Sequence, residues 1–282
     1  MKQARIAVIQ TDWTDDRETM KKKFAGLISE AASRKADLVC LQEFTLSPYF
    51  ASVLDEDNYR WAEPLENGET GQFLAEQASR HEINLIGSIF ERDEDGTFWD
   101  TAVIYGPDGA LLGHTRKVHI PSGDGYHEDH YFGGSDEYPI HKVAGLQVAA
   151  PTCYDQWFPE LSRICALNGA EFIFYPTAIG SEPTAPDFDS QGAWETVMRG
   201  QAIANGVFIA AANRTGAEGV TFYGSSFICD PMGSILAKAS RNQTEVIIAD
   251  LDPETFQTWR RLFPLINQRR PDAYGAITRK SS

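Results

Sequence analysis

Three side chains of complementary chemistry follow three apolar segments of the sequence. Glu43 follows the apolar run Asp37–Gln42, Lys117 follows Leu111–Arg116, and Cys153 follows a short run that ends at Ala150. A carboxylate, an amine and a thiol can together activate a nucleophile, move protons and stabilise a tetrahedral intermediate. The three residues are therefore candidates for covalent hydrolytic catalysis.

Cys153 is the best placed of the four cysteines for this chemistry. Pro159 suits the first turn of a following helix, and a thiol before a helix start lies near unpaired N–H groups. Such a setting lowers the pKa of a thiol and can hold an oxyanion. Cys40, Cys165 and Cys229 fall inside expected strands or a helix, where a buried inert thiol is the simpler interpretation. Taken alone, Cys153 could also be an inert cysteine.

Glu43 and Lys117 each have a structural interpretation as well. A carboxylate at the end of a buried strand is unfavourable unless it is paired or used in chemistry, and strand ends often carry the sites of α/β proteins. Lys117 could be an exposed loop lysine. Their occurrence with Cys153 at three strand ends favours the catalytic interpretation.

Other kinds of site have weaker support. The segment Gly125–His130 (GYHEDH) resembles a cluster of metal ligands, but no HExxH motif or Cys/His spacing accompanies it. The sequence also has no GxSxG, GxGxxG or P-loop motif. We therefore expect no metal and no cofactor.

Short apolar runs alternate with helical patterns along the chain, as in an α/β protein. No linker divides the sequence, so we expect one domain over residues 1–282, with a loop from Lys117 to Asp136. The expected helices are Asp15–Lys35, Glu69–His81, Glu160–Asn168, Gln191–Asn205 and one that opens at Asp252-Pro253. The expected strands are Arg5–Gln10, Asp37–Gln42, Asn84–Glu91, Phe98–Tyr105, Leu111–Arg116, Gln147–Ala150, Phe172–Tyr175, Val207–Ala212, Phe222–Cys229, Ser234–Ala237 and Thr244–Asp250.

The composition limits the classes of partner that the protein is expected to bind. The sequence has 282 residues, with 25 Lys and Arg against 40 Asp and Glu, and a net charge of −15. This charge disfavours nucleic acid and weakly favours a cationic ligand. We expect no signal peptide and no membrane span, and dispersed cysteines indicate free thiols in the cytoplasm. Residues 262–282 are expected to form a tail over a surface or a partner subunit.

The ordered motifs resemble those of the nitrilase (carbon–nitrogen hydrolase) superfamily over nearly the whole chain. They are Leu41-Gln42-Glu43-Phe44, Arg116-Lys117-Val118-His119-Ile120-Pro121 and Cys153-Tyr154-Asp155, with Glu128 at the position of the family's second glutamate. The resemblance implies a four-layer αββα sandwich that is often dimeric, so we expect a homodimer or higher homo-oligomer. It also implies that Glu43 is the general base and Cys153 the nucleophile. Lys117 and the backbone N–H of Tyr154 would stabilise the oxyanion, and Glu128 would position Lys117 and the substrate.

Four segments carry a narrower resemblance: Cys153–Glu160, Tyr175–Pro183, Phe222–Phe227 and Arg269–Asp272. Within that superfamily they make the sequence most similar to N-carbamoylputrescine amidases. In such enzymes Trp157 would border the carbamoyl group, Glu182 would lie near a distal amine, and Tyr49 would contact substrate. An N-carbamoyl amino acid would instead require an arginine to bind its carboxylate, and no arginine occurs between Arg163 and Arg199. The alternatives are a related amidase, an N-carbamoyl-β-alanine amidohydrolase, or a non-catalytic binding protein of the same fold.

Three features depart from the family pattern. Pro151 and Thr152 precede the cysteine, and a proline in a strand there predicts a β-bulge. Asp100 stands where the family has an asparagine. Residues 43–49 also differ from the usual putrescine-type segment. These departures leave the catalytic set intact and bear on the substrate.

Overall fold

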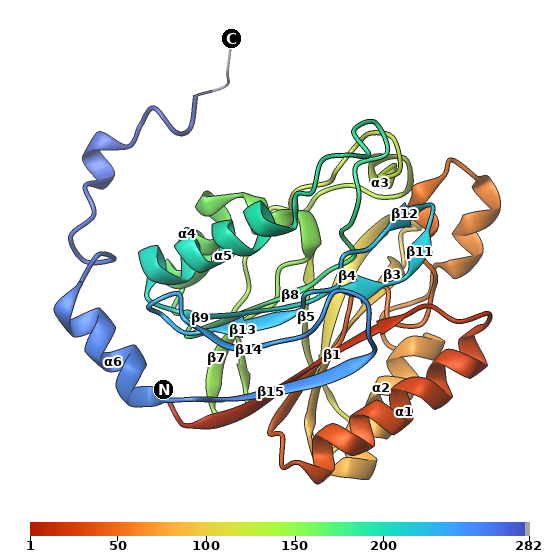
Figure 1. Ribbon diagram of the computed structural model, residues 1–282, viewed down its shortest axis with the longest axis horizontal. Coiled ribbons are helices and arrows are strands. Elements are labelled where there is room, and N and C mark those ends of the chain that lie inside the picture. Colours follow the sequence, from red (N-terminus) through yellow and green to blue (C-terminus); the bar gives the residue numbers. More distant parts are fainter. Residues whose placement is uncertain (280–282) are drawn as a thin grey trace.

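The computed structural model describes residues 1–279, in which two β-sheets lie face to face between outer pairs of helices (Figure 1). Apolar side chains of both sheets form the core between them, among them Val8 and Ile104 from the first sheet and Phe172 and Phe208 from the second. There are two further apolar clusters, one between each sheet and the helices on its outer face. The layers are therefore helix, sheet, sheet and helix, which confirms the expected αββα sandwich.

The first sheet has seven strands in the order β10-β1-β2-β3-β4-β5, and β15 also pairs with β1. β1 runs antiparallel to β15, where Ala4 faces Leu251, and parallel to β2, where Ile6 faces Leu38. A strand from the start of the sequence therefore pairs with one from its end, and β15 lies at the edge of this sheet beside β1. The bounds are β1 Ala4–Asp12, β2 Leu38–Cys40, β3 Asn84–Arg92, β4 Phe98–Tyr105, β5 Leu111–Arg116, β10 Arg214–Thr215 and β15 Glu245–Leu251.

The second sheet has six strands in the order β14-β13-β9-β8-β7-β6. β7, β8 and β9 are parallel to one another, and β8 and β9 are buried on both faces, as parallel strands usually are. A separate two-stranded ribbon consists of β11 Ala217–Glu218 and β12 Val220–Thr221. The bounds in the second sheet are β6 His141–Val143, β7 Leu146–Ala149, β8 Phe172–Pro176, β9 Phe208–Ala212, β13 Phe227–Cys229 and β14 Ile235–Lys238.

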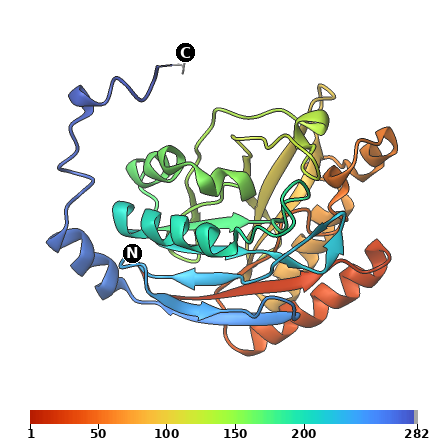
Figure 2. The same cartoon turned by 45° about the horizontal axis from the view of Figure 1, so that its top comes forward.

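Two helices cover the outer face of each sheet, as Figures 1 and 2 show. The helix α1 buries Met20, Phe24, Ile28 and Ala31 on one face because these residues recur every three or four positions. Its N-terminus is capped by Asp16, whose side chain accepts from the N–H of Thr19 at 2.7 Å. The bounds are α1 Arg17–Ser33 and α2 Glu69–His81 on the first sheet, α4 Pro159–Leu167 and α5 Gln191–Asn205 on the second, with α3 Glu128–Tyr131 and α6 Pro253–Leu262 elsewhere. Short 3₁₀ helices are η1 Phe50–Ser52, η2 Glu56–Trp61, η3 Cys153–Trp157 and η4 Pro271–Ala273.

Three local predictions are wrong. The strand expected over Phe222–Cys229 begins only at Phe227, because Gly224 and Ser225 have left-handed backbones, with φ of 52° and 59°. The loop expected from Lys117 to Asp136 contains the short helix α3. The bulge expected at Pro151 does not occur, because β7 ends at Ala149 before the proline can interrupt its ladder.

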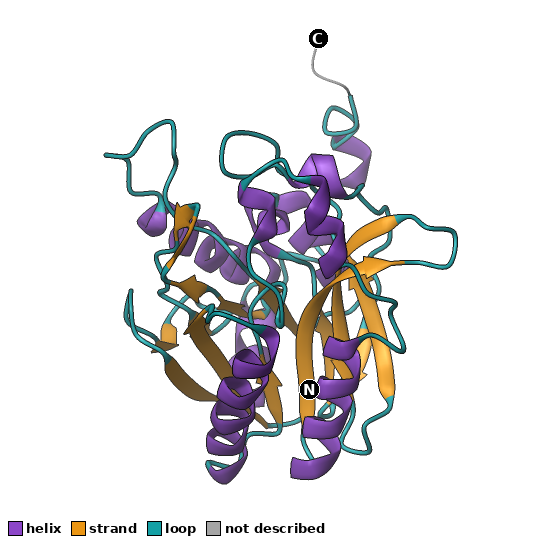
Figure 3. Cartoon of the chain, turned by 90° about the vertical axis from the view of Figure 1, so that its right-hand side faces the viewer, coloured by secondary structure: helices purple, strands orange, loops and turns teal. Residues whose placement is uncertain are grey.

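The chain leaves the body of the molecule after α6. Ile266 still packs against the cluster between the second sheet and its helices. The segment after it, which contains η4, extends away from the sandwich in Figures 1 and 2, and its end projects from the top of the molecule in Figure 3. Several apolar side chains between Leu262 and Ile277 are exposed. Within residues 1–279, no helix combines the length and hydrophobicity needed to cross a bilayer.

Candidate active site

The folded chain brings four of the predicted residues into one buried region. Glu43 lies three residues after β2, Lys117 directly follows β5, and Cys153 opens η3 four residues after β7. Glu128 is the first residue of α3. Each of these side chains is at least nine-tenths buried, so each must find its partners within the protein.

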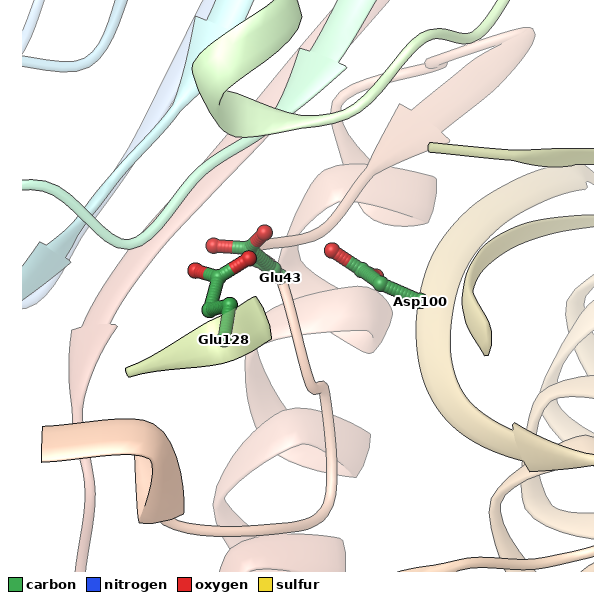
Figure 4. A group of neighbouring side chains, drawn as sticks. All are labelled: Glu43, Asp100 and Glu128. Carbon is green, nitrogen blue, oxygen red and sulfur yellow. The ribbon is translucent and has the colours of Figure 1, made fainter. Parts of the chain in front are cut away.

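The ammonium group of Lys117 is the centre of this region. Its Nζ lies 2.9 Å from Glu43 Oε1 and 3.2 Å from Asp100 Oδ2, and it also binds Glu128 Oε2. The three carboxylates turn toward one another (Figure 4) and have oxygens within 4.8 Å of one another. Such a set of oxygens could hold a cation, and in this structure the Lys117 ammonium is that cation.

Burial and charge set the protonation states in this cluster. Burial alone would lower the pKa of Lys117, but the charges of Glu128, Glu43 and Asp100 outweigh it and raise that pKa well above its usual value. Burial raises the pKa of Glu43 well above its usual range, Lys117 opposes this rise, and Asp100 and Glu128 add to it. Burial likewise raises the pKa of Glu128 against the effect of Lys117. Lys117 therefore stays charged, while the carboxylates compete for it.

Cys153 has a neutral thiol in the resting protein. Burial raises its pKa well above the usual value, the charge of Glu43 raises it further, and Lys117 opposes both. The expectation of a lowered thiol pKa is therefore wrong, because burial outweighs the effect of the short helix η3. Cys153 also has a left-handed backbone, with a φ of 40°, which is strained for a residue with a Cβ. A thiol in this state needs a base before it can attack.

Asp155 connects the loop of Cys153 with the loop of Lys117. Its carboxylate accepts from the N–H groups of Thr152 at 3.1 Å, Val118 at 3.3 Å and His119 at 2.8 Å. The ring Nδ1 of His119 also lies 2.8 Å from Asp155 Oδ1. Asp155 is fully buried and holds both loops in register. Its place in the motif Cys-Tyr-Asp was noted from the sequence, but its role was not.

A cavity of about 440 Å³ opens onto Cys153. Of the predicted substrate-binding residues, Trp157 and Glu182 line it, whereas Tyr49 does not and instead donates to Glu128 Oε1 at 3.0 Å. The charged side chains among the described residues of its wall are Glu128 and Glu182, and both are acidic. The wall consists of Pro121, Ser122, Tyr126, Glu128, Cys153, Tyr154, Trp157, Ala178, Ile179, Glu182, Phe188, Ser190 and Ala193.

Tyr126 fixes the loop that carries Glu182. Its hydroxyl donates to the carbonyl of Ser181 and accepts from the N–H of Gly180, each at 3.1 Å. Burial raises the pKa of Tyr126, and the nearby charge of Glu182 contributes to the rise. In the sequence, Tyr126 belongs to the segment Gly125–His130, whose only recognisable pattern is that of metal ligands, so its contact with this loop was not predicted.

Comparison with known proteins agrees with this geometry. Residues 5–261 match the carbon–nitrogen hydrolase family. The chain is 36% identical to a citrullinase from Francisella tularensis, over 99% of this chain and 100% of that protein. It is 34% identical to an N-carbamoylputrescine amidase from Arabidopsis thaliana, over 96% and 94% of the two chains. A crystal structure of a carbon–nitrogen hydrolase from Helicobacter pylori superposes with a TM-score of 0.93 at 33% identity, over 100% of both chains. This chain therefore belongs to the carbon–nitrogen hydrolase family, within the nitrilase superfamily that its motifs resemble.

Proposed function

We propose that this protein hydrolyses N-carbamoylputrescine to putrescine, carbon dioxide and ammonia. The observation that carries the proposal is Glu182, which lines the same cavity as Cys153. No lysine or arginine lines that cavity among the described residues. A wall of this charge suits a substrate with an ammonium group at the end opposite its carbamoyl group.

The proposed chemistry uses the buried cluster. Glu43 takes the proton of the Cys153 thiol, and the sulfur forms a bond to the carbonyl carbon. The carbonyl electron pair moves to oxygen, which the Lys117 ammonium and the N–H of Tyr154 stabilise. When the intermediate collapses, the departing nitrogen takes the proton from Glu43, leaving an acyl group on sulfur. Glu43 then deprotonates a water molecule that attacks this group, and the Cys153 sulfur leaves and recovers its proton. The carbamic acid released in this step loses carbon dioxide, which breaks the second carbon–nitrogen bond and completes the formation of putrescine and ammonia.

The cavity wall supports an alkyl amine as the substrate. Trp157, Ile179 and Phe188 offer apolar surface for a chain of methylene groups, and Glu182 is half-buried. A charge-assisted hydrogen bond between an ammonium and a carboxylate contributes about 1.5–3 kcal/mol. Loss of that bond would weaken binding by about one to two powers of ten.

The alternative substrates fit this wall less well. N-carbamoyl-β-alanine ends in a carboxylate, which Glu182 would repel. Citrulline, suggested by the Francisella relative, has the same ureido group and an ammonium that Glu182 could bind. However, it also carries a carboxylate, for which the described wall offers hydroxyl groups but no cation. A simple amide would leave Glu182 without a partner.

Ammonia release from a panel of substrates tests the proposal. The panel contains N-carbamoylputrescine, citrulline, N-carbamoyl-β-alanine, a simple amide and a neutral isostere of N-carbamoylputrescine. The change Glu182→Gln should raise KM for N-carbamoylputrescine about ten- to a hundredfold, with a smaller effect on kcat. It should leave the neutral isostere nearly untouched. Glu160→Gln is the control, because Glu160 is an exposed residue of α4 outside the cavity.

Three results would overturn the proposal. If kcat/KM for the amine over the isostere is the same in wild type and Glu182→Gln, Glu182 does not read the amine. A higher kcat/KM for citrulline or N-carbamoyl-β-alanine would assign the enzyme to that substrate. If no substrate of the panel releases ammonia, the protein is better interpreted as a non-catalytic binding protein of the same fold.

A further inference from the structure

Asp100 is a third carboxylate of the buried cluster, and the proposed chemistry gives it no role. It lies in β4, opposite Phe90 of β3, and is fully buried. Its Oδ1 accepts from the hydroxyl of Ser88 at 3.1 Å, and its Oδ2 lies 3.2 Å from Lys117 Nζ. Figure 4 shows its carboxylate directed toward those of Glu43 and Glu128.

Two oxygens of this cluster accept no hydrogen bond. They are Oε2 of Glu43 and Oδ2 of Asp100, and no donor among the described residues reaches either with hydrogen-bonding geometry, although Asp100 Oδ2 keeps its ion-pair contact with Lys117 Nζ. Both oxygens are buried, and such groups are rarely left without a partner. A single proton between two carboxyl groups lets one donate to the other and serves both at once.

The charges of the cluster also indicate that one of its carboxyl groups holds a proton. The groups that face Asp100 are Lys117 from the end of β5, Glu43 from the segment after β2 and Glu128 from α3. If all three carboxylates were ionised, one ammonium would leave two negative charges uncompensated where no side chain reaches solvent. Arg214 does not compensate them, because it pairs with Glu218 and donates to backbone carbonyls near Glu43. Like charges this close cannot all ionise without a large rise in pKa.

We propose that Glu43 and Asp100 hold one proton between them in the resting enzyme, and that Asp100 keeps this proton while Glu43 acts as base. Asp100 is in this view a positioning residue, since it acts through Glu43. Burial together with the charges of Asp100 and Glu128 raises the pKa of Glu43, which agrees with a proton on the pair. The inference rests on the proposed role of Glu43.

The proton also affects the reaction. When Glu43 takes the thiol proton, negative charge moves to sulfur and then to the substrate oxygen, beside Lys117. An ionised Asp100 would compete for that ammonium and repel the new charge. A protonated Asp100 donates to Glu43 without adding charge, so Lys117 is freer to stabilise the oxyanion.

The change Asp100→Asn tests the inference, because an amide keeps the shape, accepts from Ser88 and can donate to Glu43. Infrared spectroscopy at pH 7 should detect the carbonyl stretch of a protonated carboxyl group in the wild type. This band should disappear in Asp100→Asn and remain in the control Asp93→Asn, whose side chain faces Trp99 and Arg116 instead. Glu43→Gln should also remove the band, since the pair is then incomplete.

Kinetics supply a second measurement. Asp100→Asn should reduce kcat/KM at pH 7 by no more than about tenfold, because the amide preserves both hydrogen bonds.

The infrared band separates failure of this inference from failure of the proposed function. A band that persists in Asp100→Asn would overturn the shared proton, whatever the activity. An Asp100→Asn variant that folds yet is as inactive as Cys153→Ala would show that the charge of Asp100 is required, which contradicts the inference. A wild type that shows the band and hydrolyses no substrate would sink only the proposed function.

Discussion

The Cys153 thiol combines a strained backbone with a raised pKa, and both features bear on its reactivity. Its neutral state at pH 7 means that it gains nucleophilicity only when a base removes its proton. Glu43 is the proposed base, and its own pKa is raised by burial, so it holds a proton more strongly than an exposed glutamate. The raised pKa of Glu43 makes it a stronger base toward the thiol than an exposed glutamate would be.

Removal of this thiol should abolish turnover. We expect Cys153→Ala to lower kcat by several orders of magnitude while the fold persists, since a nucleophile has no substitute. In the wild type, a small alkylating reagent should modify Cys153 fastest, because Cys153 lines the cavity while Cys40, Cys165 and Cys229 do not. The modification rate should rise with pH, because the raised pKa keeps the thiol protonated at neutral pH. Mass spectrometry of the labelled peptides measures both, and substantial ammonia release by Cys153→Ala would contradict the mechanism.

The sequence predicted the cluster only in part. Glu43, Lys117 and Cys153 stood out because each follows an apolar run, and strand ends meet in space. Asp100 was noted as a departure from the family, yet a lone carboxylate in the apolar strand Phe98–Tyr105 was itself a signal of a buried partner. Nothing in the sequence indicated that the hydroxyl of Tyr49 donates to Glu128. Such contacts depend on side-chain directions that spacing alone does not give.

At the scale of elements, the site depends on how two loops are joined. Lys117 follows β5 in the first sheet and Cys153 follows β7 in the second, so neither sheet alone fixes their distance. Asp155 supplies the link through the N–H groups of Thr152, Val118 and His119.

Loss of this link should weaken the fold and the activity together. Asp155→Ala leaves three backbone donors without their acceptor, and we expect it to lower the free energy of unfolding by about 2–4 kcal/mol. Urea denaturation measures the change. Asp155→Asn, which keeps one acceptor oxygen, should lose less, and Asp95→Ala in the exposed turn after β3 is the control. An Asp155→Ala protein as stable and active as the control would mean that the loops hold their places without it.

Where an element has a strong hydrophobic pattern, its predicted first and last residues agree with the structure. The helices Glu69–His81 and Gln191–Asn205 and the strands Phe98–Tyr105 and Leu111–Arg116 have the expected bounds. The errors have local causes that hydrophobic patterns do not report. Ser225 adopts a left-handed backbone although it is not a glycine, and a helix of four residues such as α3 is too short to show a period.

At the scale of the whole molecule, the C-terminal segment is the part that the sandwich does not explain. Leu262, Phe263, Leu265 and Ile277 are exposed along a segment that leaves the body. Exposed apolar side chains concentrated on one segment are typical of a surface that binds another protein. We propose that this segment packs against a second copy of the chain, as expected for a homodimer.

The oligomeric state should therefore depend on the tail. Removal of residues 264–282, or the paired change Leu265→Asp and Ile277→Asp, should shift the protein toward the monomer, because each buried apolar side chain contributes about 1.5–3 kcal/mol. Analytical ultracentrifugation over a range of concentrations measures the shift. Leu54→Asp is the control, because Leu54 is a leucine of the body that is as exposed as Ile277. A truncated protein with the same mass in solution as the full chain would exclude the tail as the interface.

The pairing of β1 with β15 has a consequence for synthesis on the ribosome. The first strand to emerge has Glu245–Leu251 as its partner along one edge, and at roughly 5–20 residues per second that partner follows only after about 12–50 s. During this interval β1 offers an unpaired edge, which other nascent chains can join. A chaperone that binds the N-terminal half would protect it, and a polypeptide released before residue 245 could not finish the sheet that positions Glu43 and Lys117. Prematurely terminated products would thus be inactive and open to proteolysis, so the hydrolase would work only once translation of this strand is complete.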